Sequence, residues 1–286
     1  MGQKIDTRSI GLDVGLSFIK WLTGEENLHY GYWDGLNVNA ANLNAAQVAY
    51  TDRLFALLPD HPCRILDIGG GAGETARKLI ALGHTVDIVV PSPFLASRCR
   101  ENAPEATVHE CMFEDFTSQG PFDVCLFSES YQYIPLDRGL KGCLERLTPE
   151  GCIIISDCFR TEGFRSADTV NGAVVGGGHW LSDFRALIAQ SPVTVVSDDD
   201  ITSAVAPSVE IEQGLFNVLG YALTRVDDEI SGKRPKTRWA IGAVLNRVMS
   251  ERRRVRLAQR LQEQTRNRDV FAANNHYLMM KLTRSA

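Results

Sequence analysis

The sequence predicts an α/β fold in which a seven-stranded, mostly parallel sheet has helices on both faces and carries a helical cap. Between residues 63 and 158, short apolar runs alternate with helical segments of about ten residues, a pattern typical of parallel strands joined by crossover helices. Two further segments, 1–60 and 206–270, are mostly helical and lie outside this alternation. These two segments are expected to form the helical cap.

Each short apolar run in the alternating region predicts a buried strand, since parallel strands are covered on both faces. Strands are expected at 63–69, 84–90, 106–112, 122–128, 151–158, 193–202 and 276–282. Helices are expected at 74–83, which ends at Gly83, and at 93–102, 137–147 and 181–190.

The flanking segments divide the chain into four parts. Residues 1–60 form an N-terminal helical cap, and residues 61–205 form the ligand-binding core. Residues 206–270 form a helical lid insertion, and residues 271–286 supply a last strand that returns to the core sheet. Cap and lid are expected over the carboxyl edge of the sheet, where open α/β sheets bind ligands.

Charge is concentrated in one part of the lid. Residues 233–268 contain 12 Lys and Arg against two Glu, a net charge of +10 in a chain whose formal net charge is −5. Such a segment is either a solvated helix face that packs on the acidic body or a site for an anionic substrate, a membrane surface or nucleic acid.

Composition excludes several protein classes. The seven cysteines show no C-x-x-C pair and no metal-ligand spacing, so we expect reduced, buried thiols and no metal site. No apolar stretch approaches the roughly 20 residues of a membrane span, and the first residues lack a signal-peptide apolar region. A cytoplasmic protein is the expectation.

The stretch RILDIGGGAGETA, residues 64–76, predicts a ligand-binding turn between a strand and a helix. Glycines allow positive φ and close approach of the backbone to a ligand, and the helix start offers free N–H groups to an anion. The spacing D-x-G-x-G-x-G, with acid at Asp67 and glycines at Gly69, Gly71 and Gly73, does not fit the dinucleotide pattern G-x-G-x-x-G. A P-loop is excluded because no Lys-Ser/Thr follows.

This stretch resembles the first motif of the class I S-adenosylmethionine (SAM)-dependent methyltransferases, which have a Rossmann-like fold. The resemblance covers roughly residues 27–160. The segments HYGYWDG (29–35) and LNAAQ (43–47) look like the N-terminal segment of sterol, tocopherol and cyclopropane-fatty-acid-type enzymes. The resemblance implies SAM as the cofactor and an aromatic side chain, Tyr30, Tyr32 or Trp33, that closes over its methionine end. Packing within a cap helix is the alternative for these aromatics.

The resemblance also implies contacts to the ribose and adenine of SAM. Most relatives end the second strand with an acid that binds the ribose, but Val90 stands there, as in cyclopropane-synthase-like relatives that lack the acid, and Ser92 becomes the candidate ribose contact. Phe113 is expected to supply an N–H and an apolar wall to adenine. Glu114 or Asp115 would accept from the exocyclic amine, or the two acids merely start a turn.

Catalytic candidates follow the fourth strand. The resemblance places Ser128 and Glu129 beside the sulfonium, where a carboxylate could stabilise positive charge, orient the substrate or take a proton. Glu129, His179 and Tyr133 are, in that order, the candidates for a general base. Glu129 could instead cap a helix, and His179, at the end of a glycine run, could instead pack a loop.

The sequence therefore predicts a SAM-dependent methyltransferase that acts on a small or lipid-like acceptor, isoprenoid or phenolic in character. An acceptor with a phosphate or carboxylate would be anchored by the basic segment Lys233–Arg256. The alternative is a SAM-binding protein of the same fold that catalyses a cyclisation or elimination, or acts as a sensor. A nucleic-acid partner is not expected, peripheral membrane contact is compatible with the charge, and no oligomeric state follows.

Overall fold

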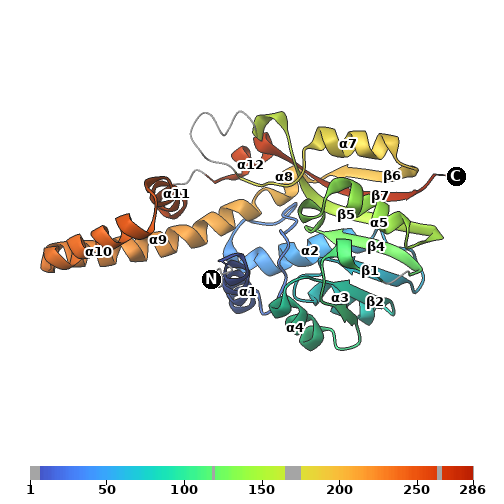
Figure 1. Ribbon diagram of the computed structural model, residues 1–286, viewed down its shortest axis with the longest axis horizontal. Coiled ribbons are helices and arrows are strands. Elements are labelled where there is room, and N and C mark those ends of the chain that lie inside the picture. Colours follow the sequence, from blue (N-terminus) through green and yellow to red (C-terminus); the bar gives the residue numbers. More distant parts are fainter. Residues whose placement is uncertain (1–6, 118–119, 165–174, 263–265, 286) are drawn as a thin grey trace.

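The computed structural model describes residues 7–117, 120–164, 175–262 and 266–285 (Figure 1). Its centre is a seven-stranded sheet in the order β3-β2-β1-β4-β5-β7-β6. The strands are β1 Arg64–Ile68, β2 Thr85–Val89, β3 Thr107–His109, β4 Phe122–Ser128, β5 Leu147–Arg160, β6 Val193–Asp200 and β7 Asn275–Arg284. The first five pair in parallel, and β7 lies antiparallel to both β5 and β6, so the predicted mostly parallel sheet is confirmed.

Helices cover both faces of this sheet, as predicted. The α-helices are α1 Thr7–Thr23, α2 Leu43–Phe55, α3 Glu74–Ala81, α4 Pro93–Asn102, α5 Leu136–Leu144, α7 Leu181–Gln190, α8 Thr202–Val205, α9 Ser208–Lys233, α10 Pro235–Val248, α11 Glu251–Gln262 and α12 Arg268–Asn274. Short 3₁₀ turns lie at Ala40–Asn42, Phe113–Asp115 and Tyr131–Tyr133.

Alternation along the strands builds two separate cores. In β1, Ile65 packs in a core with side chains of α2, α3 and α4, whereas its neighbour Leu66 packs on the other face with side chains of α5 and α7. The same alternation in β4 places Leu126 in the first core and Phe127 in the second. Successive strand residues point to opposite faces, so a strand that is apolar throughout requires helices on both sides.

Two strands differ in length from the expectation. The third expected strand, 106–112, is reduced to Thr107–His109, because β3 is at the edge of the sheet and pairs with β2 alone. The fifth, expected at 151–158, extends to Leu147–Arg160, because it lies between β4 and β7 and has partners on both sides.

The segment 206–270 leaves the core between β6 and β7. The first turns of α9 are buried against the body at Ser208 and Val209, and α11 packs on the middle of α9. The outer part of α9 and all of α10 project from the body as a helical arm (Figure 1). The inner part of α9 and α11 are the helices of this segment that lie beside the body (Figure 1).

We expect Gly220→Ala to destabilise the protein. A Cβ at this position of α9 would lie 2.0 Å from the Leu261 carbonyl oxygen of α11, so the helices must separate. Overpacking of this kind costs about 1–3 kcal/mol, more than the roughly 1 kcal/mol that Ala gains over Gly within a helix. Urea unfolding measures the change.

Gly214→Ala is the matched control, because Gly214 is also in α9 and a Cβ there would meet nothing within 4 Å. Its free energy of unfolding should rise by up to about 1 kcal/mol. Equal stabilisation by the two alanines would contradict the close packing of α9 on α11.

Candidate active site

The glycine turn between β1 and α3 has the backbone geometry that the sequence predicts. Gly69, Gly71 and Gly73 have φ of 76°, 56° and 89°, the left-handed region that favours glycine. A Cβ on Gly69 would lie 2.4 Å from the Cβ of Ser130, and one on Gly73 would lie 2.9 Å from the Cα of Cys99. The turn therefore draws the end of β4 and helix α4 close to the end of β1.

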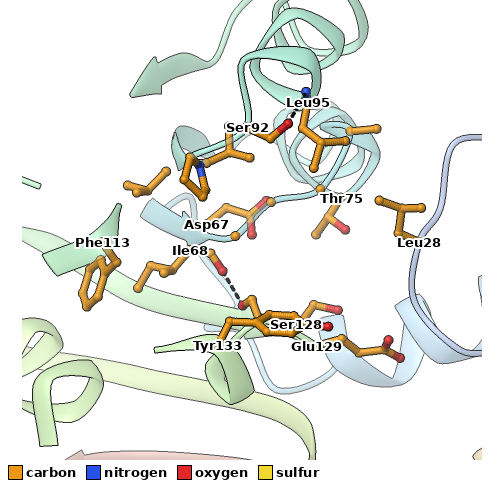
Figure 2. Close-up of a pocket in the computed structure, with 18 of the residues that line it drawn as sticks. Leu28, Asp67, Ile68, Thr75, Ser92, Leu95, Phe113, Ser128, Glu129 and Tyr133 are labelled. Atoms are coloured by element: carbon orange, nitrogen blue, oxygen red, sulfur yellow. Dashed lines mark hydrogen bonds between the residues drawn. The ribbon is translucent and has the colours of Figure 1, made fainter. Parts of the chain in front are cut away.

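A cavity of about 440 Å³ opens beside this turn (Figure 2). Its walls come from the turn, the ends of β2 and β4, the loop after β3, and residues 26–29 ahead of α2. The predicted site residues that line it are Asp67, Gly69, Gly71, Ser92, Phe113, Glu114, Ser128, Glu129 and Tyr133. The carboxyl ends of neighbouring parallel strands meet at one edge of the sheet, which brings together residues that are distant in the sequence.

Asp67 carries a buried carboxyl group at this cavity. Its side chain lies among the residues around the cavity in Figure 2, and neither of its oxygens has a hydrogen-bond partner among the described residues. Burial raises the pKa of Asp67 to about 7. A buried carboxyl of this kind is complementary to a ligand that brings a positive charge or a hydrogen-bond donor.

Glu129 is a second, half-buried carboxyl at the cavity, and its backbone is held in an unusual conformation. Its φ is 58°, uncommon for a residue with a side chain. Its Oε1 accepts hydrogen bonds from the Tyr30 backbone N–H at 2.6 Å and from the Tyr277 hydroxyl at 2.9 Å. Burial, and to a lesser extent the charge of Asp157, raise the pKa of Glu129 to about 8. Glu129 is therefore mostly protonated at neutral pH.

A second cavity, of about 510 Å³, lies next to the first. The two share five lining residues: Asn27, Leu28, His29, Glu129 and Tyr133. The second cavity has an apolar wall from the N-terminal cap and from α9, whose members are Phe18, Ile19, Leu43, Ile211, Leu215 and Phe216. Glu129 thus lies at the junction of a cavity built on the glycine turn and a largely apolar one.

A buried network of hydroxyl groups supports Glu129. The Tyr277 hydroxyl, which donates to Glu129, lies 2.9 Å from the Tyr50 hydroxyl. Tyr50 in turn donates to Ser156 at 2.7 Å and lies 3.3 Å from the hydroxyl of Ser128. No sequence pattern predicted this network, because β7 carries Tyr277 to within reach of Glu129 across 148 residues.

Comparison with known proteins identifies the domain. Residues 65–151 match the family described as a methyltransferase domain. The chain carries a class I SAM-dependent methyltransferase domain. SAM is therefore its cofactor, as the sequence predicted.

Two curated relatives agree with this family. The chain is 28% identical over 218 residues to 27-O-demethylrifamycin SV methyltransferase of Amycolatopsis mediterranei (strain S699), a match that covers 69% of this chain and 77% of the relative. It is 26% identical over 129 residues to tRNA 5-carboxymethoxyuridine methyltransferase of Escherichia coli (strain K12), covering 42% of this chain and 49% of that protein.

Solved structures show the same fold over nearly the whole chain. A putative sarcosine dimethylglycine methyltransferase from Galdieria sulphuraria superposes with a TM-score of 0.67 at 16% identity, covering 96% of this chain and 99% of that one. The cyclopropane synthase MmaA2 from Mycobacterium tuberculosis gives 0.65 at 16% identity, covering 98% and 100%. The [4+2]-cyclase SpnF gives 0.63 at 14% identity, covering 98% and 94%.

The first cavity of the methyltransferase domain has the polar groups that SAM requires. The unpartnered carboxyl of Asp67 would face the cationic part of the cofactor, and the glycine turn would let the backbone approach it. Glu114 has a buried Oε2 without a partner among the described residues, which would accept from the adenine amine. The residues present therefore fit the cofactor.

The ribose position remains without an acid. Val90 is buried and lines the cavity with its apolar side chain. The Ser92 hydroxyl lies beside it but accepts a hydrogen bond from the Leu95 backbone N–H at 3.3 Å, which caps helix α4. The hydroxyl keeps its own proton for a ligand, so Ser92 can serve both purposes.

The structure does not bring every predicted site residue to a cavity. Trp33 lines neither cavity, because its indole N–H is bound to the Ser208 hydroxyl at 2.8 Å in the core of the cap. Tyr30 lines the second cavity but not the first. Gly73 sets the turn without reaching the cavity surface.

The two weaker candidates for a general base differ in position. His179 lines neither cavity, and its Nε2 lies 2.8 Å from the Ile134 carbonyl and 3.1 Å from that of Tyr131, so it donates within the protein. Tyr133 lines both cavities and is 60% exposed, which places it at the mouth. Of the three candidates, Glu129 alone lines both cavities without being exposed.

Within 7–117, 120–164, 175–262 and 266–285, no helix combines the length and hydropathy that crossing a bilayer requires. The same ranges contain no group of three or more His, Cys, Asp or Glu side chains placed to hold a metal ion.

We expect binding of S-adenosylhomocysteine to strengthen between pH 6 and pH 8. Asp67 ionises across this window, since its pKa is about 7, and only the carboxylate attracts the positively charged amino group of the ligand. The affinity should rise by up to about tenfold. Asp67→Asn should remove this dependence and weaken binding at pH 8, as measured by calorimetry.

Glu74→Gln is the control, because Glu74 also lines the cavity but its carboxylate is already bound by Arg77. This variant should keep the pH dependence of the wild type. An affinity that is flat or falls toward pH 8 in the wild-type protein would overturn the role of Asp67.

Proposed function

We propose that the protein transfers the methyl group of SAM to a small, largely apolar acceptor bound in the second cavity, and that Glu129 takes a proton from the accepting atom. The observation that carries this proposal is the place of Glu129 between the two cavities, where desolvation by the surrounding protein raises its pKa to about 8. A general base works best when its pKa is near the operating pH.

For methyl transfer, the main task of the chain is to position the acceptor. SAM supplies an activated methyl group, so holding the acceptor in line and excluding water provides most of the rate enhancement. The Tyr30 N–H and Tyr277 hydroxyl hold Oε1 of Glu129, which leaves Oε2 for a proton of the acceptor. A base is needed where that atom carries a proton, as in a phenol or an alcohol.

The comparisons support a small-molecule acceptor. One relative is named for methylation of 27-O-demethylrifamycin SV, which is a small molecule. Side chains of the cap and of α9 form the apolar wall of the second cavity, and this wall suits an apolar acceptor.

Incubation with methyl-labelled SAM and a small-molecule extract of the host tests the proposal. We expect one labelled small molecule and an equal amount of S-adenosylhomocysteine. Conversion of an acceptor without label would instead indicate the non-methylating alternative, a chemistry for which the neighbour SpnF is named a cyclase. No labelled product in the presence of tight cofactor binding would refute methyl transfer.

The rate should rise with pH to a plateau above about pH 8, since Glu129 acts only when ionised and its pKa is about 8. Glu129→Gln should reduce kcat by roughly 10²–10⁴-fold without comparable loss of cofactor affinity. Single-turnover kinetics with methyl-labelled SAM and the acceptor identified above measure the pH dependence of the rate and the effect of the substitution.

Two variants should move this pH profile in opposite directions. Tyr277→Phe removes a donor to the Glu129 carboxylate, so the profile should shift to higher pH. Asp157→Asn removes a nearby negative charge, so the profile should shift to lower pH. A profile unmoved by both variants would show that the titrating group is not Glu129.

A further inference from the structure

Three charged side chains meet in the wall of the second cavity. Glu212 of α9 accepts from Arg260 of α11 at 2.9 Å through one carboxylate oxygen, and from Arg266 at 2.7 Å through the other. All three residues line the cavity. Two guanidinium groups thus share one carboxylate, and a net positive charge remains.

The charge balance of the whole cavity is also positive. Besides these three residues, its ionisable lining groups near neutral pH are Glu129 and His29. Burial lowers the pKa of His29 to about 4 and raises that of Glu129 to about 8, so both are mostly uncharged at pH 7. Among the described residues, the second cavity therefore carries a net charge of about +1.

Both guanidinium groups are held in place and keep unused donors. Arg260 lies over the Phe216 ring, 4.1 Å from its centroid, and its carbonyl accepts from the Gln213 side chain. The side chain of Arg266 is only 18% exposed, and its Nε has no hydrogen-bond partner in the part of the chain that the structure describes. A guanidinium has five N–H donors, and carboxylate and phosphate match its geometry.

The arginines and Glu129 lie in different parts of the cavity. The Arg260 side chain is 44% exposed and reaches the rim, whereas Glu129 is half-buried and lies where the second cavity meets the first. The apolar wall belongs to the same cavity. An acceptor that fits has its accepting atom beside Glu129, an apolar body, and an anionic group at the rim.

We propose that Arg260 and Arg266 form a binding site for a carboxylate or phosphate group of the acceptor, with Glu212 as the internal anion that this group displaces. The site deepens the proposed function, on which it rests. Arg260 and Arg266 follow the basic segment Lys233–Arg256 in the chain, and none of the side chains of that segment that the structure describes lines either cavity.

Calorimetry of the protein saturated with S-adenosylhomocysteine tests the site in the absence of methyl transfer. The probes are 4-phenylbutyrate, 4-phenylbutyl phosphate and the uncharged 4-phenylbutanamide, which share one apolar body. We expect at least one of the anions to bind about tenfold tighter than the amide, with a preference that weakens as salt is raised. The two anions distinguish carboxylate from phosphate recognition.

Three variants separate anion binding from a purely structural ion pair. Arg266→Gln should lose most of the preference for the anion. Glu212→Gln should raise anion affinity about threefold or more and leave amide affinity unchanged, because it removes the competing carboxylate. Arg268→Gln is the matched control, since its ion pair with Glu210 lies outside both cavities, and it should change neither affinity.

Equal binding of anion and amide, no measurable anion binding at millimolar concentration, or weaker anion binding in Glu212→Gln would each overturn the site. The last result would show that Glu212 only ties α9 to α11. Thermal unfolding of each variant verifies that it is folded, and a gain of affinity cannot arise from unfolding. Anion preference without any methylated product would leave the site standing and refute the proposed function instead.

Discussion

The close approach of backbone segments at the glycine turn is the constraint on which the rest of the structure depends. Gly69 brings the end of β4 against β1, and Gly73 brings α4 against α3, both at distances that no Cβ allows. These contacts place Asp67, Ser128 and Glu129 around one cavity. Since the left-handed φ values and the contacts coincide, the local conformation and the tertiary packing select the same residue.

Three carboxyl groups near the cavities are wholly or partly removed from solvent. Asp67 and Asp157 are buried and Glu129 is half-buried, and desolvation raises the pKa of each toward or above neutrality. Asp157 is held by the backbone and side chain of Gln132, whereas Asp67 has no partner among the described residues. A protein core excludes unpaired charge at a substantial cost, so a carboxyl kept there without a partner indicates a ligand.

Local patterns predicted the parts of the site that are local in the chain. The spacing from Asp67 to Gly73 identified the turn, and the apolar runs identified the strands that carry it, because both signals lie within a few residues. Tyr277 and Arg266 were not predicted, since each reaches its cavity only through the pairing of β7 or the packing of α9. Trp33 and His179 were predicted as site residues from the segments in which they lie. Their ring N–H groups instead donate to the Ser208 hydroxyl and to a backbone carbonyl, respectively.

The excursion through α9–α11 starts after β6 and returns to β7, and these strands are neighbours in which Asp200 pairs with Leu278. The two ends of this segment are thus close together. Its length or sequence can therefore change without altering the strand order of the sheet. Every residue around the first cavity lies between positions 26 and 134, whereas the second draws a wall from this excursion. On the proposed function, exchange of this segment would alter the choice of acceptor and leave the lining of the first cavity unchanged.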